Sequence, residues 1–129
     1  MKIRVYYEDT DAAGIVYYAN YLRFAERART ELLRDLGYSH GQIANVAFAV
    51  RYCEADYKKP ARLDDLLEVK TDLTQLGGAS LEMRQSILRE GEELVLLHLK
   101  LACITRDARP ARIPAELREK LASLLEKKD

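Results

Sequence analysis

The chain has 129 residues, of which 48% are hydrophobic and 33% charged, and its 21 basic residues balance 21 acidic ones. This composition is typical of one folded domain over residues 1–129, and the zero net charge argues against binding of nucleic acid or an anionic membrane by bulk electrostatics. No apolar stretch is long enough to span a bilayer and residues 1–5 turn polar too quickly for a signal peptide, so we expect a cytoplasmic protein without an integral membrane segment.

The first predicted element is a strand over residues 2–7, whose apolar residues alternate at Ile3, Val5 and Tyr7. A helix is predicted over residues 21–36, where apolar residues recur every three or four positions. Its expected buried stripe consists of Tyr21, Leu22, Ala25, Ala28, Leu32, Leu33 and Leu36. Asn20 is placed to cap the start of this helix, and Gly37 to end it in a left-handed conformation.

Alternation returns after residue 41 and predicts four more strands, at residues 46–52, 67–73, 81–87 and 94–104. The last of these is nearly continuous in Leu and Val, which predicts a central strand. Pro114 is placed to open a short C-terminal helix. The order of strand, helix, four strands and helix predicts an α+β fold in which the long helix packs on an antiparallel sheet.

Residues 7–21 lie between the first strand and the helix and read Tyr-Glu-Asp-Thr-Asp-Ala-Ala-Gly-Ile-Val-Tyr-Tyr-Ala-Asn-Tyr. Two acids one residue apart, Asp9 and Asp11, stand beside an apolar run. A carboxylate beside apolar surface loses hydration unless amides or charges replace the water, and the N–H groups at a helix N-terminus can do so. The segment therefore predicts a carboxylate that is fixed by hydrogen bonds or charges beside a hydrophobic pocket. The alternative is that both acids only cap turns, as Asp residues near Gly commonly do.

The same segment resembles the Asp-x-Asp-x-x-Gly-x-x-Tyr-x-x-x-Tyr signature of the 4-hydroxybenzoyl-CoA thioesterase-like and YbgC-like acyl-CoA thioesterases of the hot-dog-fold superfamily. The resemblance continues through residue 104 and is strong again at residues 56–65. It implies a five-stranded antiparallel sheet wrapped around a long central helix, plus a short C-terminal helix. It also implies a hydrolase that cleaves the thioester of a small or aromatic acyl-CoA without a metal or other cofactor.

This resemblance makes Asp11 the catalytic carboxylate, either as a nucleophile that attacks the thioester carbonyl or as a base that deprotonates water. Asp9 is expected to bond backbone amides of its loop. The backbone N–H of Tyr18 is the expected oxyanion donor, because amides near a helix N-terminus are fixed and point at negative charge. Relatives linked to the Tol-Pal cell-envelope system often carry His where this chain has Tyr18, whereas 4-hydroxybenzoyl-CoA thioesterases carry Tyr. The acyl substrate of neither branch can therefore be assigned to this chain.

Coenzyme A carries phosphates, so Lys and Arg side chains are expected at the mouth of the pocket. The candidates fall into two clusters, one of Lys58, Lys59 and Arg62 and the other of Arg106, Arg109 and Arg112. Either cluster can serve this role.

Other active-site classes have little support in the sequence. The two histidines are His40, expected in a loop, and His98, expected to be packed or at an interface; no Gly-x-Ser-x-Gly motif accompanies them. Cys53 and Cys103 lie in strand-like segments and are expected to be buried reduced thiols.

One helix against five strands leaves sheet edges unpaired, which predicts a homo-oligomer, a dimer at least, with the tetramer favoured. In the family that the chain resembles, two subunits join edge to edge into one sheet with active sites at the interface. The strand at residues 46–52 is the expected edge. The competing function is a non-catalytic acyl- or protein-binding module with the same fold.

Overall fold

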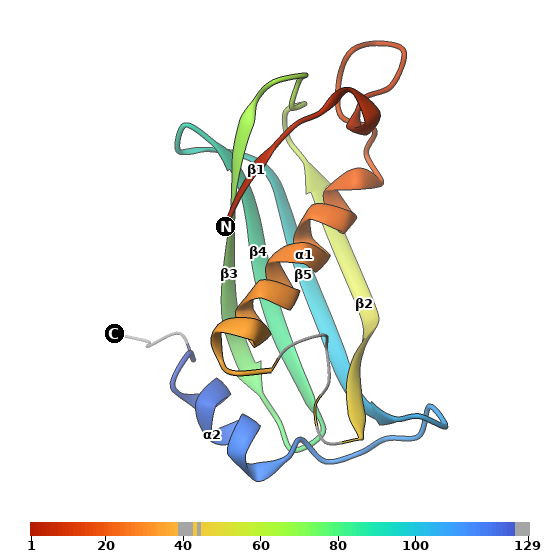
Figure 1. Cartoon of the computed structure of the whole chain (residues 1–129), viewed down its shortest axis with the longest axis vertical. Helices are drawn as coiled ribbons and strands as arrows, with labels where there is room; N and C mark the ends of the chain where they lie inside the picture. Colours follow the sequence, from red (N-terminus) through yellow and green to blue (C-terminus); the bar gives the residue numbers. More distant parts are fainter. Residues whose placement is uncertain (39–42, 44, 126–129) are drawn as a thin grey trace.

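The computed structural model describes residues 1–38, 43 and 45–125. Five strands form one antiparallel sheet in the order β1-β3-β4-β5-β2, and a helix lies across one face of it (Figure 1). The elements are β1 (Lys2–Arg4), the short helix η1 (Tyr7–Asp9), α1 (Asn20–Asp35), β2 (Val46–Tyr57), β3 (Leu66–Leu76), β4 (Ser80–Arg89), β5 (Glu92–Thr105) and α2 (Ala115–Ala122). No helix in the described ranges is long and apolar enough to cross a membrane.

Helix α1 forms because good helix formers fill it and its apolar residues recur on one face. Its buried residues are Tyr21, Phe24, Ala25 and Ala28. The small alanines let the helix lie close to β3 and β4, the strands it packs against. At the end of the helix, Gly37 has a φ of 102° and donates its N–H to the Arg34 carbonyl, while Tyr38 donates to the Leu33 carbonyl. This hydrogen-bond pair is the Schellman motif that the position of Gly37 predicted.

Two features of the N-terminal region differ from the expectation. Strand β1 ends at Arg4, and Tyr7 begins η1 with 82% of its surface exposed instead of facing the core. Asn20 does not cap α1, because it is the first helical residue and its side-chain amide donates to the Asp9 carbonyl at 3.0 Å. Both differences arise because the chain turns sharply after β1 to form the loop that carries the two acids.

The buried face of α1 is also rotated from the predicted one. Phe24 is buried, although the predicted stripe omitted it, and Leu22 is exposed, although the stripe included it. The reason is that α1 packs mainly on β3 and β4 and less on β2. A sequence pattern gives the period of the buried face but not which neighbours cover it.

The sheet places β4 in the middle, with β5 between β4 and β2. The predicted fifth strand is therefore internal, with a partner on each side. In the described part of the chain β2 pairs only with β5, so it is the edge strand that the sequence predicted. It runs to Tyr57, beyond the predicted end, because a β-bulge between Val50 and Tyr52 breaks the alternation without ending the strand.

The core consists of two apolar clusters on the helix-covered face of the sheet. The first lies beneath the N-terminal half of α1 and includes Phe24 and Ile87; the second includes Met83 and Leu117, the latter from α2. Gln85 lies between Ile87 and Met83 on the same face of β4 and is fully buried. A polar layer therefore separates the two apolar clusters.

Candidate active site

The loop formed by residues 10–19 joins η1 to the N-terminus of α1 (Figure 1). Thr10 forms an antiparallel bridge with Val16, and Ile15 forms one with Arg62. Gly14 turns the loop with a φ of 77°, a conformation that residues with a Cβ adopt only at a cost. These contacts fix the loop with respect to both the helix and the segment between β2 and β3.

The two acids of this loop have different surroundings. One carboxylate oxygen of Asp11 accepts the Ala13 N–H at 2.8 Å, which leaves the other without a hydrogen-bond partner among the described residues. Asp9 accepts the N–H of Tyr6 at 2.9 Å, so it bonds a backbone amide as expected. The sequence predicted that the Asp11 carboxylate loses hydration beside an apolar surface. In the single chain Asp11 is exposed, so its carboxylate is not desolvated.

The backbone N–H of Tyr18 lies just before α1. Within the described ranges it donates to no acceptor, whereas the N–H groups of Tyr17 and Asn20 are both bonded. Free N–H groups at the start of a helix attract negative charge, because the helix dipole is positive there. The arrangement offers a hydrogen-bond donor for an oxyanion on the same loop as Asp11.

Aromatic rings gather around the start of α1 and form what we call the aromatic cluster, made of Tyr17, Tyr18, Tyr21 and Tyr57. The ring centroid of Tyr18 lies 5.0 Å from that of Tyr17 and 5.9 Å from that of Tyr57, which in turn lies 5.8 Å from Tyr21. All except Tyr21 are exposed. The rings are tilted or edge-to-face to one another, and together they present an apolar surface at the start of α1. The sequence analysis did not name Tyr57 as a site residue, although it lies in the segment 56–65 where the family resemblance is strong.

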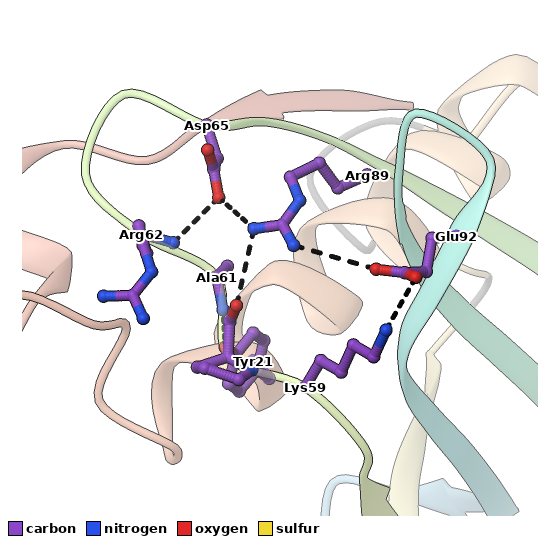
Figure 2. Close-up of polar contacts among 8 residues, drawn as sticks. Tyr21, Lys59, Ala61, Arg62, Asp65, Arg89 and Glu92 are labelled. Atoms are coloured by element: carbon purple, nitrogen blue, oxygen red, sulfur yellow. Dashed lines mark hydrogen bonds and ion pairs between the residues drawn. The ribbon is translucent and has the colours of Figure 1, made fainter.

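Figure 2 shows how the segment between β2 and β3 is held beside this cluster. The buried Tyr21 hydroxyl accepts the Ala61 N–H at 2.9 Å. Asp65 accepts the Arg62 N–H at 2.8 Å and the Arg89 guanidinium at 2.7 Å. Burial alone would raise the pKa of Asp65, but these donors outweigh burial and hold the pKa below its ordinary value. The carboxylate thus fastens the segment to β4.

The predicted coenzyme-binding residues do not lie together in one chain. Lys58, Lys59 and Arg62 follow β2, at the end of the sheet that carries the Asp11 loop. Arg106 and Arg109 follow β5, at the opposite end of the sheet (Figure 1).

The three residues at the Asp11 end differ in their partners. Lys58 forms an ion pair with Glu93, and Lys59 forms one with Glu92 at 2.9 Å. Arg62 is exposed, and its guanidinium forms no ion pair within the described part of the chain. Of these cations, Arg62 is therefore the one without an ion-pair partner in the described residues, although its charge contributes to the lowered pKa of Asp65.

Other candidate residues are placed differently from expectation. His98 is exposed on the outer face of β5, so of its two expected placements the packed one is wrong and the one at an interface stays a prediction. Cys103 is buried as predicted, but Cys53 is exposed, because α1 does not cover the edge strand. His40 lies outside the described residues. Among those that are described, no group of His, Cys, Asp or Glu side chains is arranged to hold a metal ion.

A cavity of about 370 Å³ lies between the C-terminal half of α1 and the first half of β2. We call it the α1–β2 cavity. Its lining includes Glu26, Arg29, Leu33, Phe48, Val50 and Met83, and neither Asp11 nor Tyr18 belongs to it. The cavity is on the helix-covered side of the sheet, farther along α1 than the aromatic cluster.

An antiparallel five-stranded sheet with one helix packed across it is the hot-dog fold, and solved structures share it. A probable thioesterase from Bartonella henselae superposes with a TM-score of 0.83 at 39% identity, over 88% of this chain and 97% of that one. A family model described as the thioesterase-like superfamily matches residues 5–121. The chain belongs to this superfamily, which confirms the family and fold that residues 7–21 indicated.

Two curated proteins are similar over most of their length. The acyl-CoA thioester hydrolase YbgC of Escherichia coli is 45% identical over 126 residues, which are 91% of this chain and 93% of that protein. The acyl-CoA thioesterase YbgC of Haemophilus influenzae is 41% identical over 120 residues, or 90% of this chain and 88% of that protein.

Proposed function

We propose that residues 1–129 form a single thioesterase domain that hydrolyses the thioester bond of an acyl-CoA. The observation that carries this proposal is the placement of a carboxylate and an unbonded amide on one loop. Asp11 keeps one oxygen free, and the Tyr18 N–H has no acceptor in the described ranges. The similarity to proteins named as acyl-CoA thioesterases supports the same chemistry.

Two routes lead to the same products. In one, Asp11 attacks the thioester carbonyl carbon, the carbon–sulfur bond breaks, and water then hydrolyses the resulting mixed anhydride. In the other, Asp11 accepts a proton from a water molecule that attacks the carbonyl carbon directly. In both routes the carbonyl oxygen gains negative charge that the Tyr18 N–H stabilises. Coenzyme A leaves as the thiolate, which takes a proton from solvent in the first route and from the protonated Asp11 in the second.

The aromatic cluster supports a small or aromatic acyl group as the substrate. Tyr17 and Tyr18 follow the Asp11 loop directly, so an acyl group whose carbonyl lies at the Tyr18 N–H is beside their rings. Flat aromatic groups gain from such contacts through both buried area and ring geometry.

The exposure of Asp11 supports a site that a second subunit completes. If two β2 edges pair antiparallel about a two-fold axis, the start of one β2 lies beside the end of the other. Thr105 pairs with Val46 at the start of β2, so Arg106 and Arg109 follow directly from that end. In such a dimer the partner subunit's Arg106 and Arg109 approach the Asp11 end, where both basic clusters can contact one coenzyme A.

The test is thiol release from a panel of short, aromatic and long acyl-CoAs. We expect turnover, with kcat/KM highest for short or aromatic acyl groups. Absence of turnover across the whole panel would overturn the proposal and favour the non-catalytic acyl- or protein-binding module.

A further inference from the structure

The polar layer between the two core clusters is built around Gln85. Its side-chain amide nitrogen donates to the Ala25 carbonyl and to the Thr71 hydroxyl, both at 3.0 Å. Its oxygen accepts a hydrogen bond from the Arg29 guanidinium at 2.9 Å. Both N–H groups and the oxygen of this buried amide therefore have partners, and Gln85 holds the guanidinium at a fixed point over the sheet.

Arg29 is half-buried, and its guanidinium stays charged. Burial lowers its pKa, and the nearby Glu26 and Cys53 oppose that shift. An arginine in such surroundings remains protonated at neutral pH. Within the described ranges the guanidinium forms no ion pair, and its hydrogen bond goes to Gln85 alone. Most of its N–H donors are therefore available to a ligand.

The α1–β2 cavity lies over the second apolar cluster, and Arg29 lies at its polar end. The polar residues that line it, Glu26, Arg29 and Thr30, occupy one stretch of α1. Beyond them the walls are apolar and come from α1, the sheet and α2, through Leu33, Phe48, Leu81, Leu101 and Leu121. The cavity is therefore amphipathic, with a cation at one end and an apolar body.

We propose that the α1–β2 cavity binds an aliphatic carboxylic acid, with the carboxylate on Arg29 and the alkyl chain along the second apolar cluster. A carboxylate matches the charge and fork geometry of a guanidinium, and an alkyl chain gains by leaving water for the apolar walls. The volume of about 370 Å³ is at the small end of the range of about 300–1,000 Å³ for ligand sites, which suits a chain of medium length.

This site is separate from the one at the Asp11 loop, because neither Asp11 nor Tyr18 lines the cavity. The inference therefore does not rest on the proposed thioesterase function. The thiol-release test and the binding test below can fail independently of each other.

Glu26 also lines the cavity, and its charge opposes the ligand. It is exposed and forms no ion pair within the described ranges. A carboxylate at the polar end repels a second one. Removal of the Glu26 charge should therefore strengthen binding of a carboxylic acid, whereas removal of the Arg29 charge should weaken it.

The test follows a methyl NMR signal from inside the cavity. The chain has two methionines, of which Met83 lines the cavity and Met1 does not, so isotope-labelled methionine gives one signal at the site and one reference. Octanoate and 1-octanol have equal length and differ in charge, and both are titrated into the wild-type chain at neutral pH. We expect both to shift the Met83 signal and to leave the Met1 signal in place.

Octanoate should bind about 10-fold more tightly than 1-octanol, as one charge-assisted hydrogen bond provides. Raising the salt concentration should reduce this affinity ratio. From butanoate to octanoate the affinity should rise by up to about 4-fold for each methylene that leaves water.

Variants assign the affinity ratio to side chains. Arg29→Leu should reduce the ratio to about 1, because the cation is lost and the apolar stem is largely kept. Arg27→Leu is the matched control and should leave the ratio unchanged, since Arg27 is exposed on α1 and does not line the cavity. Glu26→Gln should raise the ratio. Arg29→Lys keeps the charge without the fork, should give an intermediate ratio, and covers the case in which Arg29→Leu does not fold.

Three outcomes would overturn the inference. Equal affinities for octanoate and 1-octanol in the wild-type chain would mean that the cavity accepts alkyl groups without reading the carboxylate. An unchanged ratio in Arg29→Leu, or in Arg29→Lys where that variant replaces it, would give Arg29 a structural role only. A Met83 signal that responds to neither compound would show that the cavity takes no such ligand.

Discussion

At the scale of single residues, the site depends on the different hydrogen bonds that Asp9 and Asp11 make within one loop. Asp9 uses its carboxylate to hold the Tyr6 amide, and its carbonyl accepts hydrogen bonds from Tyr17 and Asn20. Asp11 is held by a single N–H, that of Ala13, and keeps one oxygen free. The same residue type two positions apart therefore has a structural task in one case and is available for chemistry in the other.

This difference predicts opposite effects of two matched substitutions. Asp11→Asn keeps the size and most hydrogen bonding but removes nucleophilicity and basicity, so kcat should fall by at least ~10²-fold. Acyl-CoA binding should persist or tighten, because a negative charge that faces the substrate is removed. Asp9→Asn should act mainly by lowering the unfolding temperature. Steady-state thiol release and thermal unfolding of both variants distinguish these effects. Near-normal turnover in folded Asp11→Asn would shift the assignment to Glu26 and Glu31, the acids on α1.

The residues that sequence reasoning found and missed differ in the range of their contacts. Asp9 and Asp11 were recognisable because the loop that holds them is contiguous in sequence. Tyr57 and the pair of Arg29 and Gln85 join different elements, so no local pattern specifies them. Gln85 does leave one signal, since it is the polar residue in an otherwise apolar alternation of β4.

At the scale of elements, the segment between β2 and β3 is fastened by charge rather than by secondary structure. Asp65 joins its end to Arg89 of β4, and the Tyr21 hydroxyl holds its middle from below (Figure 2). The sequence predicted the strands on either side but not this fastening, because it depends on the register that brings β4 alongside. The same limit explains the short prediction for β2, since a bulge breaks alternation without breaking hydrogen bonding.

Asp65 should make stability depend on pH. Its pKa in the folded chain lies below that in the unfolded chain, so the folded state binds fewer protons. The stabilisation is present above the unfolded pKa of about 4 and is lost as the pH falls through the folded pKa. Asp65→Asn should cost about 1–2 kcal/mol at pH 7, with a smaller difference from wild type at about pH 3.

Urea unfolding at both pH values measures this effect. Asp64→Asn is the control, because the neighbouring Asp64 is exposed and its side chain makes no hydrogen bond in the described ranges. An Asp65→Asn cost that does not change with pH would show that the fastening is not electrostatic.

The basic residues beside the site should affect coenzyme binding rather than chemistry. Neutralising Arg62 should raise KM and spare kcat, because a phosphate contact is equally strong in the ground and transition states. Neutralising Lys58 or Lys59 should raise KM less, since these lysines already form ion pairs with Glu93 and Glu92. Substrates truncated to the pantetheine arm should not respond to these changes. Equal losses on full and truncated substrates would make the residues structural.

At the scale of the whole molecule, the uncovered edge strand predicts self-association. Val50 and Tyr52 on β2 are both about half exposed, at 48% and 47%, in the middle of a strand with one free edge. Such an edge is normally covered or joined to another chain. Light scattering at micromolar concentration should therefore give the mass of a dimer or a tetramer. A monomer mass would contradict both the edge-to-edge dimer and the shared site.

The two apolar clusters divided by Gln85 have a consequence for how the native protein opens. The cluster near α2 draws on the end of the chain, whereas the cluster beneath the start of α1 holds the Asp11 loop. Native-state hydrogen exchange should show amides of α2 exchanging through a partial opening of low free energy, while those at the start of α1 require global unfolding. Exchange of both groups at the global free energy would show one cooperative unit. Where such a partial opening occurs, substitutions in α2 should change the local stability of that helix without disturbing the Asp11 loop.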